Sequence, residues 1–281
     1  GGSGKGKTDL QTKVVDFAGT DSLVKPEDVS KYASGGGILY FPTVAAPITV
    51  SYNLSGVDNV KLDAPTLAKI FQGDIKTWDD AAIKALNSGV SLPSTNIVVA
   101  HRSDASGTTS NFSKYLDAAA AGTWKLGASD TITWPSGQQG GNGNSGVAAI
   151  VKSTKGAIGY VDLADSKASS LQVAQIKNKA GNFEAPTLTG AAAAVAGATV
   201  KPDLTYSPID ATGADAYPIT SPTWIIVYKK WTDTAKGDAM KAFLNYILTD
   251  GQALANPAGY APLPTDLALK AVAQLDMLQI G

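Results

Sequence analysis

The chain has 281 residues, of which 44% are hydrophobic and 17% charged, and its formal net charge is −1. This length suits two α/β domains better than one core, and the composition argues against a disordered chain or a coiled coil. The charge balance argues against a nucleic-acid-binding surface, which needs clustered positive charge. No apolar run approaches the roughly 18–20 residues that span a bilayer, and no segment has signal-peptide character, so we expect a cytosolic or already processed protein.

Cysteine is absent, and histidine occurs once, at His101. The chain therefore cannot form disulfides or thiolate metal sites, and it offers almost no imidazole for metal clusters or Ser-His catalysis. We predict no metal and no other cofactor. Among the 23 basic residues only Arg102 is an arginine. Because lysine cannot replace the planar guanidinium where two oxygens of one oxyanion are held together, Arg102 is a candidate functional residue.

The predicted elements alternate between strands and helices along the chain. Residues 36–52 are rich in β-branched and aromatic side chains and predict strand structure that Pro42 and Pro47 break. Asp63 as a cap and Pro65 in the first turn then predict a helix with an apolar face.

The middle of the chain repeats this alternation. Residues 96–100 predict a short, buried parallel strand, and the helix that follows includes Phe112 on its apolar face. A glycine-rich loop at 137–146 leads into another short helix. Gly156 stops that helix, and a strand at 157–161 follows.

The last third of the chain ends in a predicted strand and helix. The alanine-rich stretch 191–200 is compatible with a helix or with a loose surface segment. Residues 223–228 predict a buried strand. Apolar positions within 240–248 predict an amphipathic helix that Gly251 ends. This alternation predicts α/β architecture with two parallel sheets, a ligand cleft between two domains, and crossings by short strand-like segments instead of a long linker.

The most informative motif runs from Arg102 to Thr108, between a predicted strand and the next helix. This position puts Ser106, Gly107 and Thr108 at a helix N-terminus, where free N–H groups and the helix dipole favour an anion. Arg102 adds its guanidinium, which Asp104 would hold in place. An ordinary Ser/Thr cap beside a solvated Arg-Asp pair is the alternative. The solitary arginine makes us favour an oxyanion site.

The chain opens with a glycine-rich segment that formally satisfies the phosphate-loop pattern GxxxxGK[ST], with Lys7 and Thr8 as its last two residues. That pattern is meaningful only between a buried strand and a long helix, and no strand of this sequence precedes it. A nucleotide site is therefore disfavoured. We favour an anion-contacting turn in which Ser3 and neighbouring amides face the ligand, and a flexible terminal linker is the remaining alternative.

Asp21 follows a short predicted strand, and it is either a loop cap or a specificity residue. An ionised carboxylate only accepts hydrogen bonds. It therefore accepts a bond from an oxyanion that carries a proton and repels one that does not. Phosphate at neutral pH is largely HPO₄²⁻, whereas sulfate has no proton, so Asp21 in the site would select phosphate over sulfate.

The motifs of common enzymes are missing. The sequence contains no G-x-S-x-G elbow, no His-x-x-x-His pair and no aspartates with metal-loop spacing. His101 fits a residue at the end of a strand better than a general base. We therefore predict a binding protein and not an enzyme.

Several segments resemble the periplasmic phosphate-binding protein family of bacterial phosphate ABC transporters. The segments that carry the resemblance occur in the same order and cover essentially the whole chain: 15–21, 71–80, 102–108, 143–147, 156–160 and 217–221. The resemblance implies the two-domain substrate-binding fold of type II, with a ligand cleft between the domains. Residues 1–47 and 218–281 would form the first domain, and residues 48–217 the second.

The resemblance also implies roles for individual residues. It assigns phosphate contacts to Ser3, Asp21, Arg102, Ser106, Gly107 and Thr108, with Asp104 steadying Arg102. It implies a monomer that captures inorganic phosphate in the periplasm, or otherwise outside the cytoplasmic membrane, and delivers it to the membrane permease of a phosphate ABC transporter. A lipid anchor through an amino-terminal segment stays open.

One departure from the family concerns the amino terminus. The resemblance implies a further strand, glycine-rich loop and helix ahead of position 1, and that loop would donate contacts to phosphate. Without the strand, one sheet edge would be exposed. We therefore expect the site to be best defined around Arg102 and least defined at Ser3. The alternatives are a carrier of another tetrahedral oxyanion, a phosphate-releasing hydrolase on a similar scaffold, and a nucleotidase that uses Lys7.

Overall fold

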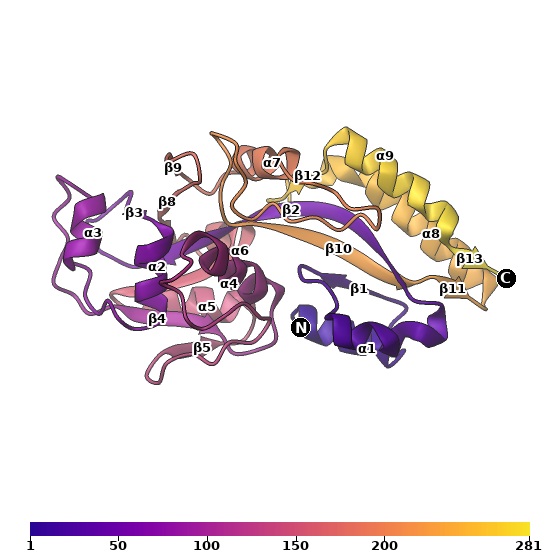
Figure 1. The fold of residues 1–281 in the computed structure, drawn as a ribbon, viewed down its shortest axis with the longest axis horizontal. Helices are drawn as coiled ribbons and strands as arrows, with labels where there is room; N and C mark the ends of the chain where they lie inside the picture. Colours follow the sequence, from indigo (N-terminus) through magenta and orange to yellow (C-terminus); the bar gives the residue numbers. More distant parts are fainter.

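One long strand, β2 (Ile38–Tyr52), runs through both halves of the molecule in the computed structural model, which describes residues 1–281 (Figure 1). Its first part pairs antiparallel with β10 (Thr220–Tyr228), and its last part pairs antiparallel with β6 (Ala157–Asp162). The partner changes between Pro47 and Ile48. Fifteen residues in β conformation span about 50 Å, which is long enough to serve two halves.

The main sheet therefore continues from one half of the molecule to the other. Its order is β1 (Phe17–Thr20), β10, β2, β6, β4 (Val98–Arg102) and β5 (Gln139–Gly141), with β7 (Gln172–Val173) and β12 (Ala261–Pro262) also paired to β2. Parallel pairing within it is confined to the contacts of β4 with β5 and β6. The prediction of two parallel sheets is wrong, because β2 and its antiparallel partners join the halves into one mixed sheet.

Two prolines do not break β2, contrary to expectation. Pro42 pairs with Trp224 beside a register shift in β10, and Pro47 is the last residue of β2 that pairs with that strand. Proline lacks an N–H group, so it is tolerated at irregular or changing positions of a ladder. The chain thus crosses between the halves by a strand, as predicted, but by one continuous strand.

The chain forms nine α-helices (Figure 1). They are α1 (Ser3–Gln11), α2 (Ala64–Phe71), α3 (Ala81–Leu86), α4 (Gly107–Ala119), α5 (Gly143–Ser153), α6 (Leu163–Ala168), α7 (Leu188–Ala196), α8 (Thr234–Leu248) and α9 (Thr265–Gln274). Short 3₁₀ segments cover Pro26–Gly35, Asp250–Leu254 and Leu275–Met277, and the small sheets contain β3 (Lys61–Leu62), β8 (Gln175–Lys177), β9 (Phe183–Glu184), β11 (Lys230–Trp231) and β13 (Gln279–Ile280). Helix α3 lies beside the small sheet that contains β3, away from the main sheet (Figure 1). None of the helices combines the length and apolar character needed to cross a bilayer.

Most predicted elements are confirmed. The Asp63 side chain caps α2 by accepting the Thr66 N–H at 3.0 Å. The alanine-rich stretch contains a helix, α7, and Gly251 lies in the 3₁₀ segment just after α8. The loop at 137–146 contains a feature that its glycines did not indicate, the strand β5, which pairs with β4.

Two separate hydrophobic cores define two lobes. The core of the second lobe includes Trp78, Tyr115 and Tyr160 and lies under the last part of β2. The main core of the first lobe includes Phe41 and Trp224 and lies among β2, β10, α8 and α9, while a smaller cluster joins α1 to β10. The chain therefore has the two-domain α/β architecture that the sequence predicts.

Candidate functional site

A polar cavity of about 520 Å³ lies between the lobes, and no hydrophobic side chain lines it. All seven residues singled out from the sequence are among its lining residues: Ser3, Asp21, Arg102, Asp104, Ser106, Gly107 and Thr108. The first two belong to the first lobe, and the other five lie in the second lobe, between the last residue of β4 and the start of α4. Folding thus brings together residues that are up to 105 positions apart in the sequence.

The Arg102 side chain is held by hydrogen bonds on two sides. It ends β4 and is only 7% exposed. Its Nε and Nη2 atoms donate to the two carboxylate oxygens of Asp104 at 2.7 and 2.6 Å, while Nη1 donates to Asn144 Oδ1 at 3.0 Å and to Thr108 Oγ1 at 3.4 Å. These bonds lower the pKa of Asp104 to about 2. Asp104 therefore orients the guanidinium, and one Nη2 proton stays without a partner in the protein.

Three helices begin at this cavity. The first residues of α1, α4 and α5, namely Ser3, Gly107 and Gly143, all line it. Neither Gly2 before α1 nor Asn142 before α5 caps its helix with a side chain. The Gly4 and Gly143 N–H groups donate to Ala105 and Asp104, whereas the N–H groups of Ser3 and Gly107 have no partner in the protein. The three helix dipoles add positive potential at one place. Such an arrangement favours a small anion.

The hydroxyls at the start of α4 are free to donate. Ser106 Oγ accepts the N–H of Thr109 at 3.1 Å, so it is the helix cap that the alternative interpretation expected. A cap uses a lone pair of the hydroxyl and leaves its proton unused. Thr108 Oγ1 likewise accepts from Arg102. Capping and ligand binding are therefore compatible at this helix end.

Gly107 allows the two lobes to approach closely. A Cβ atom at this position would overlap Ser3 Oγ and the side chain of Asp21. Ser3 itself is buried, and its Oγ accepts the Asp21 N–H at 3.1 Å. Because α1 and α4 meet at Gly107, any larger residue there would push the walls of the cavity apart.

Besides Asp104, three more carboxylates line the cavity: Asp21, Asp162 and Asp165. Burial raises the pKa of Asp21, although Thr223 Oγ1 donates to it at 2.6 Å and Arg102 lies nearby. Burial, together with Asp21 and Asp165, raises the pKa of Asp162 to about 7. The site therefore combines positive donors with one carboxyl group, that of Asp162, that resists ionisation.

Sequence reasoning missed Asn144 and Asp162. Asn144 accepts from Arg102 and donates from Nδ2 to Asp162 Oδ2 at 2.7 Å, so its amide links the guanidinium to the carboxyl group. The only sequence signals were that Asp162 follows the strand predicted at 157–161 and that Asn144 lies in the glycine-rich loop. Helix α1, whose N-terminus lies at the site, was also not predicted from the sequence.

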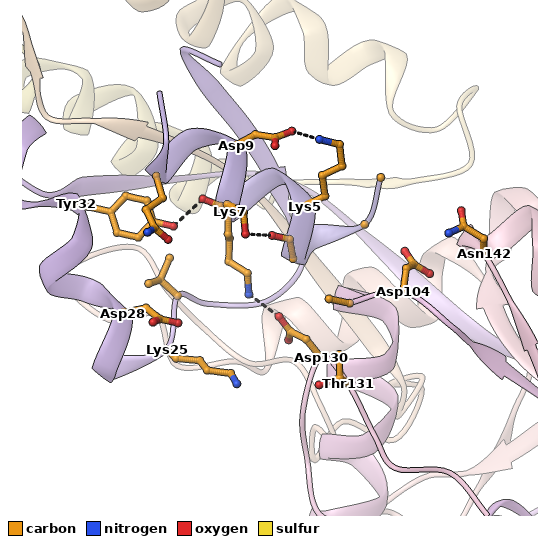
Figure 2. Close-up of a pocket in the computed structure, with 17 residues that line it drawn as sticks. Lys5, Lys7, Asp9, Lys25, Asp28, Tyr32, Asp104, Asp130, Thr131 and Asn142 are labelled. Carbon is orange, nitrogen blue, oxygen red and sulfur yellow. Dashed lines mark hydrogen bonds and ion pairs between the residues drawn. The ribbon is translucent and has the colours of Figure 1, made fainter. Parts of the chain in front are cut away.

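Lys7 and His101 lie outside the cavity lining. Lys7 Nζ donates to Asp130 Oδ2 at 2.6 Å and to Ser22 Oγ at 2.8 Å, and Figure 2 shows it extending from α1 to Asp130. The His101 ring stacks on Trp134 with 5.0 Å between ring centroids, and burial lowers its pKa. The phosphate-loop pattern therefore does not direct its lysine into the anion cavity, and His101 occupies the strand end as predicted.

Comparisons with known proteins identify similar sequences and folds. Residues 1–251 match the PBP superfamily domain. The chain is 38% identical to phosphate-binding protein PstS 2 of Mycobacterium tuberculosis, over 99% of this chain and 78% of that protein, and 38% identical to PstS of Xylella fastidiosa, over 95% and 73%. It shares its fold, with a TM-score of 0.83 and 24% identity, with a high-affinity periplasmic phosphate-binding protein solved with phosphate, over 100% of this chain and 88% of that chain. An ABC-type phosphate transport receptor of Vibrio cholerae superposes with a TM-score of 0.60 and 19% identity, over 94% and 86%.

We predict that Asp162→Asn changes how stability depends on pH. The native carboxyl has a pKa of about 7 against an ordinary value of 3.8, so the folded protein binds more protons than the unfolded chain between those values. The free energy of unfolding of the wild type therefore falls as pH rises through this window. Asparagine does not ionise and can still accept the bond from Asn144. The variant should melt at a higher temperature than the wild type at about pH 8, and the difference should shrink towards about pH 4.

Thermal unfolding followed by circular dichroism in phosphate-free buffers measures this difference. Asp117→Asn, at an exposed position of α4, is the matched control and should track the wild type. Parallel pH profiles for the wild type and Asp162→Asn would show that Asp162 is ordinarily ionised.

Proposed function

Because the chain belongs to the family of PstS phosphate-binding proteins, we propose that it binds inorganic phosphate between its lobes and delivers it to the permease of an ABC-type phosphate importer. One observation carries the proposal: the single guanidinium of the chain, held by Asp104, meets three helix N-termini in a cavity without apolar lining. Arg102 is the only basic residue among the lining side chains. This set of donors suits a small oxyanion and offers nothing to an organic group.

We assign the donors as follows. The guanidinium of Arg102 binds one side of the phosphate, and the hydroxyls of Ser106 and Thr108 donate from the start of α4. The backbone N–H groups at Gly107 and Ser3 bind further oxygens. These groups come from both lobes, so bound phosphate would draw the lobes together.

Asp21 supplies the acceptor that distinguishes phosphate from sulfate. Its Oδ1 atom is occupied by Thr223, whereas Oδ2 faces Gly107 at the start of α4. An anion held by α4 would therefore meet Oδ2. The proton of HPO₄²⁻ completes a hydrogen bond to this oxygen, while sulfate would leave two acceptors in contact.

The proposal includes the setting of the protein. We infer that the protein acts outside the cytoplasmic membrane, because a similar solved structure is described as a periplasmic phosphate-binding protein. We further propose that it acts as a monomer. A lipid anchor would keep it close to the permease. We place the domain boundaries at 47/48 and 217/218, and the change of β2 partner after Pro47 supports the first of them. Before the second boundary, Leu204 and Tyr206 pack onto the core of the first lobe, so this part of the chain contacts both lobes.

A binding role fits the cavity better than hydrolysis does. No lysine, histidine or cysteine lines it, so hydrolysis would have to rely on its hydroxyl and carboxyl groups alone. Turnover of a chromogenic phosphate ester would favour the hydrolase instead. Competition by molybdate or sulfate at equal concentration would favour a carrier of another tetrahedral oxyanion.

We predict that Arg102→Lys weakens phosphate binding by about 30-fold or more, because charge-assisted hydrogen bonds contribute about 2 kcal/mol and each 1.4 kcal/mol is tenfold in affinity. Lysine keeps the charge but loses the planar donors that Asp104 orients. Isothermal titration calorimetry measures the dissociation constant. Lys5→Ala, which removes an exposed cation on α1, is the control and should bind like the wild type. Equal affinities for Arg102→Lys and the wild type would reject the assignment.

We predict that Asp21→Asn lowers the preference for phosphate over sulfate. The amide can donate to an unprotonated oxygen, so sulfate loses the repulsive contact that excludes it. Competition titrations with sulfate against bound phosphate measure the ratio of the two affinities. Asp165→Asn is the matched control, since Asp165 lines the same cavity and has no part in the assignment. If sulfate stays excluded from Asp21→Asn, the acceptor argument is wrong.

A further inference from the structure

An ion pair between Lys7 and Asp130 joins the two lobes beside the anion cavity (Figure 2). We propose that this pair is an interlobe latch that holds the lobes together and positions the start of α4, so that it sets how slowly a bound anion leaves. The proposal rests on the proposed function, because phosphate is the anion whose release is measured.

The two partners belong to different lobes. Lys7 lies in α1, which packs on β1 and contributes Leu10 to a first-lobe cluster with Tyr228. Asp130 follows α4 in the second lobe, where the neighbouring Ser129 is bonded through its N–H and its carbonyl to Ser113. A bond between Lys7 and Asp130 therefore exists only while the lobes are in contact.

The pair is shielded from solvent, and the Lys7 ammonium has a hydrogen-bond acceptor for each of its three protons. The Lys7 and Asp130 side chains are 12% and 13% exposed, and Nζ lies 2.6 Å from Oδ2. The other two ammonium protons go to Ser22 Oγ at 2.8 Å and the Leu23 carbonyl at 3.2 Å. Exposed ion pairs contribute little, but removing one partner of a shielded pair leaves an uncompensated charge.

Opening the lobes would break two bonds at once. Ser22 Oγ, also in the first lobe, donates to the same Asp130 oxygen at 3.1 Å. Lys7 would keep its bonds to Ser22 and Leu23 after opening, while Asp130 would lose both of its first-lobe donors. The positively charged binding position formed by Lys7 and Ser22 would therefore stay intact in the first lobe. Asp130 would leave it when the lobes open and return when they close.

The latch is bonded directly to the anion site. The backbone carbonyl of Asp130 accepts the Ser106 N–H at 2.9 Å, and Ser106 is the cap of α4. On the other side Ser22 follows Asp21 in the chain. Asp130 therefore bonds the first lobe through its side chain and the start of α4 through its backbone carbonyl. Lys7 and Asp130 are positioning residues, because neither lines the anion cavity.

The same helix supplies a matched control. Lys5 and Asp9 also form an ion pair on α1, but both residues lie in that helix and do not bridge the lobes. Figure 2 shows Lys5 directed to Asp9 and Lys7 directed to Asp130. Removing either pair deletes one positive and one negative charge at or near α1. Only the pair of Lys7 and Asp130 connects the two lobes.

The test combines a double-mutant cycle with release kinetics. Lys7→Met, Asp130→Asn and the double variant are compared with the wild type by calorimetry and by stopped-flow release of phosphate. Each single variant should weaken phosphate binding about tenfold, mainly through faster release, and the double variant should be no weaker than the singles. In phosphate-free buffer, small-angle scattering should show a larger radius of gyration for these variants. Lys5→Met and Asp9→Asn should match the wild type in every measurement.

The outcomes separate the latch from the proposed function. A wild type that binds no phosphate overturns the proposed function. A wild type that binds, with variants of unchanged release rate or with additive single effects, overturns the latch. Should Lys7→Met fail to fold, Ser22→Ala removes one bond across the cleft without deleting a charge, and an unchanged release rate for that variant overturns the latch as well. Lys7→Arg keeps the charge and should retain most of the slow release.

Discussion

The pairing of Arg102 with Asp104 is the interaction on which the site depends. An isolated guanidinium at the end of a strand would turn towards solvent, but two short bonds to one carboxylate fix its plane. Asp104 also accepts the Gly143 N–H at 3.1 Å, so the same carboxylate ties β4 to the start of α5. The orientation of the only arginine and the position of one helix end are therefore set together.

The topology explains why three helix ends meet there. Strands β4 and β5 run parallel, so the helices that follow them, α4 and α5, begin at the same edge of the sheet. Strand β2 continues into the first lobe and brings β10 and β1 alongside, and α1 packs on β1. A single uninterrupted strand thus aligns α1 with α4, and glycine at position 107 lets them approach.

Local patterns predicted the second-lobe half of the site and little of the first-lobe half. The motif from Arg102 to Thr108 is contiguous, so a strand, a cap and a helix start were enough to identify it. Helix α1 has only Leu10 as a fully buried apolar residue and contains two internal glycines. Its sequence therefore lacks the regular spacing of apolar residues that predicts a helix. The link from Asn144 to Asp162 depends on the packing of α5 beside β6, which spacing along the chain does not specify. The single mixed sheet was missed for the same reason, because strand partners are set by tertiary contacts.

Besides Asp104, the carboxyl groups of Asp21, Asp162 and Asp165 line this site, and their presence around an anion needs a physical explanation. Each ionised carboxylate would repel phosphate and also its neighbours, and burial removes the water that would screen them. The raised pKa of Asp162 keeps that group partly neutral, and in the proposed complex the proton of HPO₄²⁻ would satisfy Asp21. The Asn144 side-chain amide connects Asp162 to Arg102, since it donates to the carboxyl group and accepts from the guanidinium. On this proposal the site would recognise an anion by how its protons are distributed as well as by its charge.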